Sequence, residues 1–223
     1  LDIKTGEITE LHTLPSADIR QVASTAFDKE NGSFFYTTHN AKGYRDVWTV
    51  NVDTGESRLL FPISGMGELA VNPKDHSLWG VNIINGMSII SVSHFPYKKI
   101  THLLPLKTET ILAHLAISPD GNKIAATLHK ANGEQEIILI DLNALLKKQL
   151  LYVSVSNAGN PEHPEWSEDG KYLYWDAYTS GVANIFRMDM NTLKAEALTN
   201  VNTGIFHPSF LDSDRIIAFY FTS

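Results

Sequence analysis

The sequence contains no cysteine in its 223 residues. Disulfide bonds, zinc–thiolate centres and thiol catalysis are therefore excluded together. Long apolar runs are also missing, because the longest, "EIILI" and "RIIAFYF", have the length of a strand and are far too short for a membrane span. There is no excess of positive charge either: 18 Lys and Arg face 25 Asp and Glu, and the net charge is -7. Such a surface repels a phosphate backbone, so we expect no nucleic-acid partner.

Signatures of catalysis are equally scarce. No G-x-S-x-G or H-E-x-x-H string occurs, so the sequence encodes neither a serine-hydrolase elbow nor a zincin helix. The string "GMGELA" at Gly65–Ala70 matches a dinucleotide fingerprint, but we expect it to lie between strands, with no helix to receive a pyrophosphate. Glu162, Glu165 and Asp176 form no evident carboxylate pair of the kind that glycosidases use. We therefore predict no catalytic residue, no cofactor and no metal.

What the sequence does contain is a repeated unit. Its clearest copy is "SEDGKYLYW", and its second clearest is "SPDGNKIAAT". The five copies are found at Ser167–Trp175, Ser118–Thr127, Asn72–Val81, Phe27–Thr37 and Leu211–Phe221. A second string, seen as "VNVDTGESRLL" and "RMDMNTLKAEAL", recurs between them. A period of about 45–50 residues is typical of propellers and of kelch-like or WD-type arrays.

Each unit has the chemistry of four short strands joined by tight turns. In "SPDG", Pro119 presets the second turn position, and Asp120 and Gly121 suit the later ones. The strands between turns are apolar on both faces, as in Tyr172–Trp175, which indicates a sheet covered by a neighbour on each side. We therefore predict an all-β propeller of four-stranded blades; a generic β-sandwich is the alternative, although it would not need a regular period. The segment Asp141–Gln149 departs from the tight turn and predicts a helical turn on the rim.

The strongest copy carries a family resemblance. Its pattern H-P-x-W-S-x-D-G-K-x-L-x-W, followed by G-x-x-x-I-F-x-M-D-x and then L-T, spans His163–Thr199. This pattern resembles the TolB-like (WD40-like, "SPDGK") β-propeller repeat. The resemblance covers nearly the whole chain and implies a periplasmic, cell-envelope or secreted module with a protein or peptide partner. Fold does not determine function, however, because similar propellers also gate the active sites of serine peptidases.

The repeat boundaries predict a single propeller over residues 1–223. We place a partial blade at 1–16, four blades at about 17–62, 63–108, 109–156 and 157–202, and a second partial blade at 203–223. The two partial blades together would lack most of a third strand, whereas a complete ring has no unpaired strand edge. We therefore expect an open arc or an incomplete blade, part of a larger propeller of six or more blades.

Aligning the repeats identifies one column of candidate binding residues. They share the start of the innermost strand and are Ser24, Glu68, His114, His163 and His207. In a propeller such residues converge near one mouth of the central channel, where they could contact a metal, an anion or a peptide. The alternative is a structural role, in which the imidazoles form hydrogen bonds between neighbouring blades.

Three functions follow from these residues and from the resemblance. The first is a non-catalytic binding module that presents its loops and its channel mouth to a protein or peptide partner. The second is the gating propeller of a larger hydrolase, whose catalytic domain is fused elsewhere in the parent protein. The third is a carbohydrate-binding propeller, for which Tyr178, in a loop that we expect to border a propeller face, is a contact candidate.

Overall fold

The computed structural model describes residues 5, 7, 10, 22–210 and 215–221. In this part of the chain nearly all regular structure is β-strand, arranged as four antiparallel sheets of four strands and one sheet of two strands. Each sheet follows chain order from its innermost strand outwards. We call these sheets the first to fifth blades.

The strand bounds of each blade are as follows. The first blade contains β1 (Val22–Asp28), β2 (Ser33–His39), β3 (Arg45–Asn51) and β4 (Ser57–Phe61). The second contains β5 (Met66–Val71), β6 (Leu78–Ile84), β7 (Met87–Ser93) and β8 (Thr101–Pro105). The third contains β9 (Thr110–Ile117), β10 (Lys123–Lys130), β11 (Gln135–Asp141) and β12 (Tyr152–Ser156). The fourth contains β13 (Glu162–Trp166), β14 (Tyr172–Ala177), β15 (Asn184–Asp189) and β16 (Lys194–Ala197), and the fifth contains β17 (Ile205–Phe210) and β18 (Ile216–Tyr220).

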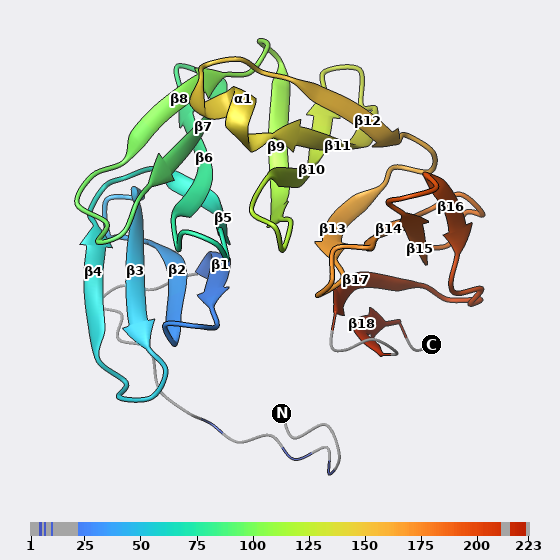
Figure 1. The fold of residues 1–223 in the computed structure, drawn as a ribbon, viewed down its shortest axis with the longest axis horizontal. Helices are drawn as coiled ribbons and strands as arrows, with labels where there is room; N and C mark the ends of the chain where they lie inside the picture. The colour runs from blue at the N-terminus through green and yellow to red at the C-terminus, as the bar shows by residue number, and fades with distance from the viewer. Residues whose placement is uncertain (1–4, 6, 8–9, 11–21, 211–214, 222–223) are drawn as a thin grey trace.

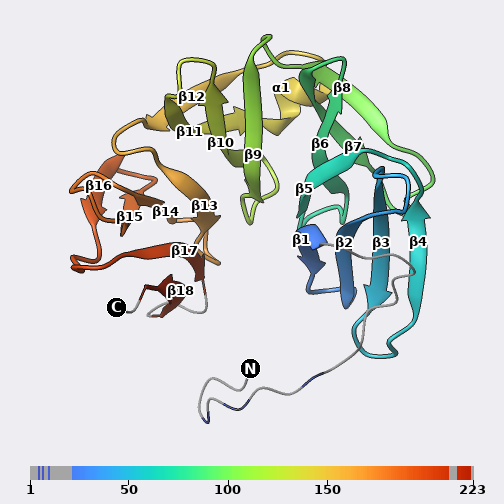
Figure 2. The ribbon, with the colours of Figure 1, turned by 180° about the vertical axis from the view of Figure 1, so that it is seen from behind.

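The blades are arranged as sectors about one axis, with β1, β5, β9, β13 and β17 nearest the centre (Figure 1). The view from behind shows the same arc, open between the first and fifth blades (Figure 2). This arrangement confirms the predicted propeller, because the two layers of a sandwich would face each other instead. The described residues form an open arc with a two-stranded last blade, as expected. The predicted partial blade at 1–16 falls almost entirely outside the described residues.

The repeated turns form as their sequence predicts. In the third blade the Gly121 N–H donates to the Ser118 carbonyl, and the Ser118 hydroxyl donates to Asp120 (2.6 Å). Gly121 has a φ of +71°, a left-handed conformation that glycine adopts without steric cost. In the fourth blade Ser167 and Gly170 form the same turn. In these two blades the turn therefore returns the innermost strand to the next strand.

Apolar side chains from adjacent blades form the core. The clusters join the first blade to the second, the second to the third, and the third to the fourth. Trp79, Ile124 and Trp175, for example, are at most 1% exposed. Each fully buried side chain of this size stabilises the fold by about 1.5–3 kcal/mol. Because this burial occurs on both faces of a blade, middle strands such as β10 and β14 are buried almost throughout rather than in alternation.

Two local expectations have different outcomes. The segment after β11 forms the short helix α1 (Leu142–Leu146), whose first turn is capped by a hydrogen bond from the Ala144 N–H to the Asp141 side chain (2.8 Å). This confirms the predicted helical turn, and at five residues α1 is too short to cross a membrane. The expectation that Gly65–Ala70 lies between strands is wrong. Its residues enter β5, because Met66 and Leu69 have buried side chains that pack between blades.

Candidate functional site

The five column residues all lie on innermost strands, which contact one another in the order β1, β5, β9, β13, β17. Each strand has a register shift at the column position, where an additional residue interrupts its pairing with the next strand. At four of these bulges the column residue has positive φ: Glu68 (+50°), His114 (+52°), His163 (+51°) and His207 (+57°). A bulge redirects a side chain from the sheet, and here it directs one residue per blade to the channel.

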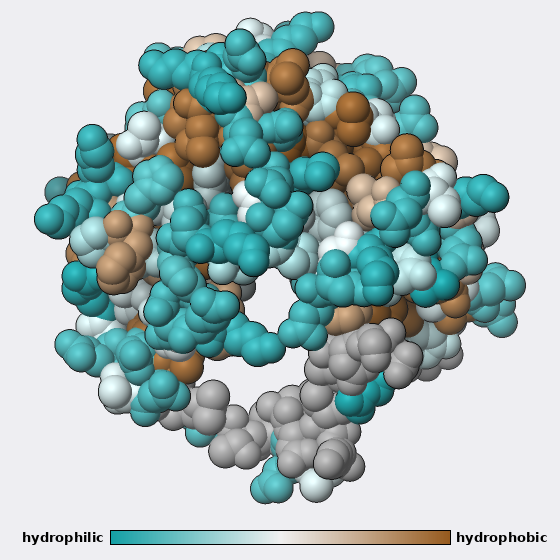
Figure 3. All heavy atoms as spheres, viewed as in Figure 1, coloured by the Kyte–Doolittle hydropathy of each residue, from teal (hydrophilic) through white to brown (hydrophobic). Residues whose placement is uncertain are grey.

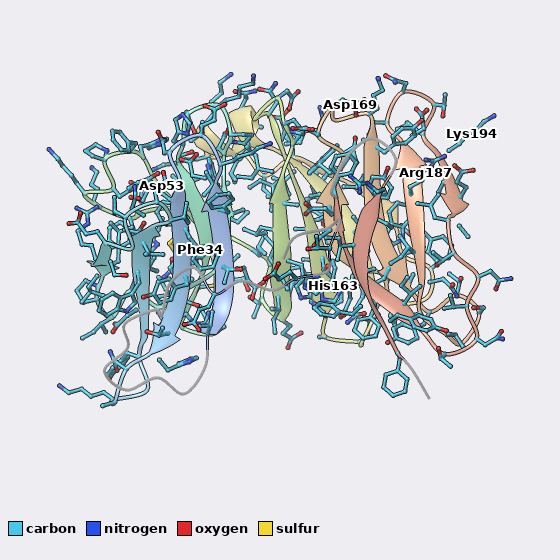
Figure 4. All side chains as sticks on the ribbon, turned by 90° about the horizontal axis from the view of Figure 1, so that it is seen from below. Phe34, Asp53, His163, Asp169, Arg187 and Lys194 are labelled. Carbon is cyan, nitrogen blue, oxygen red and sulfur yellow. The ribbon has the colours of Figure 1, made fainter. Side chains whose placement is uncertain are left out.

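The three histidines are stacked. The ring centroids of His114 and His163 are 4.1 Å apart, and those of His163 and His207 are 4.3 Å apart. Seen from the side, His163 lies towards one face of the propeller, whereas Asp169 in the repeated turn lies towards the other (Figure 4). The stack therefore marks one mouth of the channel, opposite the end at which the repeated turns lie.

Hydrogen bonds that involve column residues also join neighbouring blades. In each one, a side-chain oxygen of one blade accepts a backbone N–H of the next blade. These bonds run from Leu69 N–H to Ser24 Oγ (2.6 Å), from His114 N–H to Glu68 Oε2 (2.7 Å) and from His207 N–H to Asp176 Oδ1 (2.9 Å). The predicted structural role is therefore present, but with Ser24 and Glu68 as acceptors rather than the imidazoles. Because these bonds fix the inner strands relative to one another, the mouth is pre-organised before any ligand arrives.

Asp176 is a member of this site that sequence reasoning missed. It is 2% exposed, and its Oδ1 lies 2.8 Å from His163 Nδ1 as well as accepting the His207 N–H. A buried carboxylate is stable only when charged or polar partners satisfy it, and these two groups do so. The available signal was an acidic residue inside the apolar strand Tyr172–Ala177.

Burial and crowding lower the basicity of the stack. Burial, followed by the nearby His163, His129 and His207, lowers the pKa of His114 from 6.5 to about 4, while Asp176 opposes this shift. Burial, followed by His163, also lowers the pKa of His207. Near neutral pH these two imidazoles are therefore uncharged and can both donate and accept hydrogen bonds.

Two cavities meet inside the channel. The first has a volume of about 310 Å³, and all five column residues line it. The second has a volume of about 820 Å³ and extends towards the repeated turns. Four residues line both cavities: Thr25, Leu69, Leu115 and Glu165. Figure 3 shows hydrophilic side chains gathered around the central opening on the face that it presents. Inside, the first cavity is mainly polar, whereas the second is also lined by apolar side chains such as Ala116 and Trp166.

The structure brings some of the predicted site residues together and leaves Tyr178 apart from them. The structure brings Ser24, Glu68, His114, His163 and His207 together around one cavity. Tyr178 is 52% exposed and is not among the residues that line either channel cavity. Within the described part of the chain, no three His, Asp or Glu side chains are arranged to ligate one metal ion. Whether the column binds anything stays a prediction.

The sequence matches no known family model and no curated protein. Solved structures are similar in fold. TolB from Agrobacterium tumefaciens has a TM-score of 0.70 and 12% identity, over 87% of this chain and 72% of that chain. TolB from Acinetobacter baumannii has a TM-score of 0.69 and 16% identity, over 89% and 51%. An oligogalacturonate lyase in complex with manganese has a TM-score of 0.66 and 13% identity, over 94% and 64%.

These likenesses and the sheet order define the class of protein as a β-propeller. More closely, the fold is that of a TolB-like propeller, in agreement with the repeat pattern at His163–Thr199. At these identities the likeness shows the fold alone. The chain spans about half of the Acinetobacter protein and about two thirds of the lyase, at 51% and 64% of their lengths.

Proposed function

We propose that the chain is a non-catalytic binding module that holds a segment of a protein or peptide partner in the channel mouth. The observation that carries this proposal is the stack of His114, His163 and His207 at the opening of a polar cavity of about 310 Å³. That volume is at the lower end of the range for ligand pockets and suits one or two inserted side chains.

The hydrogen bonds of the stack support a binding role. His163 Nδ1 is bonded to Asp176, and His114 Nδ1 lies 3.4 Å from the Thr127 hydroxyl. Among the described residues, the Nε2 atoms of the three stacked histidines form no hydrogen bond. The scaffold thus positions the His114 and His163 rings by hydrogen bonds to Nδ1, and the His207 ring by its contacts with His163 and Phe219. The Nε2 side of each ring is available to a ligand. Polar groups held in this way give specificity at low entropic cost.

A location in the cell envelope forms part of the same proposal. It is supported by the resemblance of the repeat to TolB-like propellers and by the likeness to the two TolB structures. The proposal specifies only the chemical class of the partner, which is a polypeptide segment small enough to enter the mouth.

Selection from a random peptide library on the immobilised chain tests the proposal. Ala23 and Ser209 are exposed and line the first cavity, so Ala23→Trp and Ser209→Trp should fill the mouth without disturbing the core. We expect the selected peptides to bind each variant at least tenfold more weakly, as for loss of a central contact. Lys194→Trp, on the exposed outer strand β16, is the control (Figure 4). No enrichment of any peptide, or binding that both mouth variants retain, would refute the proposal.

The two other functions stay predictions with separate tests. A gating propeller requires a hydrolase domain in the parent protein, which the parent gene would show as a nucleophile elbow with its acid and histidine. A carbohydrate-binding propeller requires saturable glycan binding that is lost on Tyr178→Ala. Neither function needs the pre-organised histidine stack, and for this reason we place peptide binding first.

A further inference from the structure

One residue inside the channel departs from the repeat. Two positions after the column residue, the first three blades carry Ala26, Ala70 and Ala116, whereas the fourth carries Glu165. These residues are equivalent in the repeat, because each one pairs with β2, β6, β10 or β14 two positions before the residue that begins the turn. In the first blade Thr25 also pairs between the bulge and Ala26. Three blades thus show that the fold needs only a methyl group here. A carboxylate at this place in one blade is an addition that the fold does not require.

Glu165 lies at the waist of the channel, since it lines both cavities where they meet. It is partly buried and pairs across the sheet with Tyr174, whose ring centroid is 6.2 Å from that of Phe210. Among the described residues it forms no hydrogen bond and no ion pair. A carboxylate removed from water in this way is unfavourable until a partner compensates it.

The other carboxylates that line the two cavities already have partners. Glu68 accepts the His114 N–H, Asp28 and Glu30 contact His76 at 3.0 and 3.5 Å, and Glu168 contacts Lys29 at 3.4 Å. Lys29 is the one Lys or Arg among the described residues that line these cavities. The lining therefore carries an excess of negative charge, and Glu165 is its unpartnered member.

We infer that Glu165 is a subsite for an organic cation, a primary ammonium or a guanidinium group carried by the ligand. This inference deepens the proposed function and rests on it: the inserted segment would carry a Lys or Arg side chain that passes the histidine stack and pairs with Glu165. A metal ion fits less well, because three ligands at about 2 Å are needed and the described residues offer no such group. Phe210, which lines the second cavity together with Glu165, can pack against the alkyl stem of such a side chain.

The protonation of Glu165 supports the same ligand. Burial raises the pKa of this carboxyl from 4.5 to about 7, so ionisation near neutral pH becomes favourable when a cation arrives. Cation binding should then strengthen as pH rises through 7. The other titratable groups that line the two cavities are Glu68, His114, His163, His207, Asp28, Lys29, Glu30 and Glu168.

Titration of the whole chain with butylguanidinium, followed by NMR of the Leu69 and Leu115 methyl groups, tests the subsite directly. We expect Glu165→Gln to weaken binding about tenfold or more at pH 8, as for loss of a hydrogen bond to a charged group. The matched control is Glu196→Gln, which removes the same charge from the exposed outer strand β16. Butan-1-ol, a neutral probe with the same alkyl chain, should bind the wild type and both variants equally.

The pH dependence adds a second readout. Between pH 8 and pH 6 the ionised fraction of a group with a pKa of about 7 falls about tenfold, so wild-type affinity for butylguanidinium should fall by a similar factor. Protonation of the channel histidines would also repel the probe, but that part should persist in Glu165→Gln. Equal affinity in the wild type and in Glu165→Gln, or no binding of butylguanidinium, would overturn the inference.

The peptide selection separates this inference from the proposed function. We expect peptides selected on the wild type to be enriched in Lys or Arg at one position, and those selected on Glu165→Gln to lack that enrichment. Peptides that bind in the mouth without a basic residue would leave the proposed function standing and refute the cation subsite. Butylguanidinium binding that depends on Glu165, without any selected peptide, would support the subsite and refute the peptide partner.

Discussion

Glu165→Gln should stabilise the protein, and only at neutral to alkaline pH. The folded state holds the Glu165 proton up to pH about 7, whereas the unfolded state loses it near 4.5. The contribution of this group to stability is therefore present below pH 4.5 and is lost as pH rises through 7. A pKa difference of this size corresponds to about 3 kcal/mol. Water in the cavity screens the charge, so we expect about 2 kcal/mol to be measurable.

Urea denaturation at a series of pH values measures this effect. Glutamine cannot ionise, so its advantage over the wild type should grow from about zero at pH 4.5 to about 2 kcal/mol at pH 8. In a chain of this length the gain at pH 8 corresponds to a rise in Tm of about 4–8 °C. Glu196→Gln should stay within about 0.5 kcal/mol of the wild type at every pH. A Glu165→Gln variant that is no more stable at pH 8, or equally stabilised at both pH values, would contradict the assignment of Glu165 as a carboxylate without a partner.

Three further predictions concern the column and the repeated turn. As pH falls from 6.5 to about 4, the wild type should lose about 2–3 kcal/mol of its free energy of unfolding, because the unfolded state takes up the His114 proton before the folded state does. His114→Gln should abolish this loss, which urea unfolding at pH 7 and pH 4.5 measures. Asp176→Ala should lower the free energy of unfolding by about 1–3 kcal/mol, because a buried ring nitrogen and a backbone N–H lose their acceptor; an unchanged urea midpoint would refute this. Gly121→Ala should lower the Tm more than Gly133→Ala, since both have positive φ but a methyl group on Gly121 would approach Asn72 Oδ1 to 2.6 Å, whereas nothing lies within 4 Å of one on Gly133; equal shifts would show that only the backbone conformation matters.

The sequence was sufficient for the fold because the repeat is local and occurs several times. A tight turn such as Ser118–Gly121 and the apolar strands on either side of it define one unit, and copies at a constant period define a ring. The column residues were found for the same reason, since equivalent positions in a propeller share one place in space. This is why Glu68 and His114, far apart in the chain, meet through a hydrogen bond of 2.7 Å.

What the sequence did not predict depends on three-dimensional partners. The acceptor role of Asp176 requires knowing that β14 places it beside His163 and the next inner strand. The importance of Glu165 does not follow from a search for carboxylate pairs, but from comparison with its equivalents in other blades, which are alanines such as Ala116. The expectation that Gly65–Ala70 lies between strands was wrong because it considered the two glycines alone. The repeat alignment, which puts Glu68 on an innermost strand, predicts a strand here. Departures from a repeat, compared position by position, would have identified both Glu165 and Asp176.

The bulge on each innermost strand separates specificity from stability. The backbone there, and not the identity of the side chain, determines that position 68, 114, 163 or 207 faces the channel. Evolution or design can therefore exchange residues 114, 163 and 207, within those that tolerate a left-handed backbone, and change what the mouth recognises while the apolar blade interfaces are retained. Glu68 is the exception, because its side chain also joins the second blade to the third. In a propeller of this kind, the ligand specificity of the channel mouth can therefore change while the fold is retained.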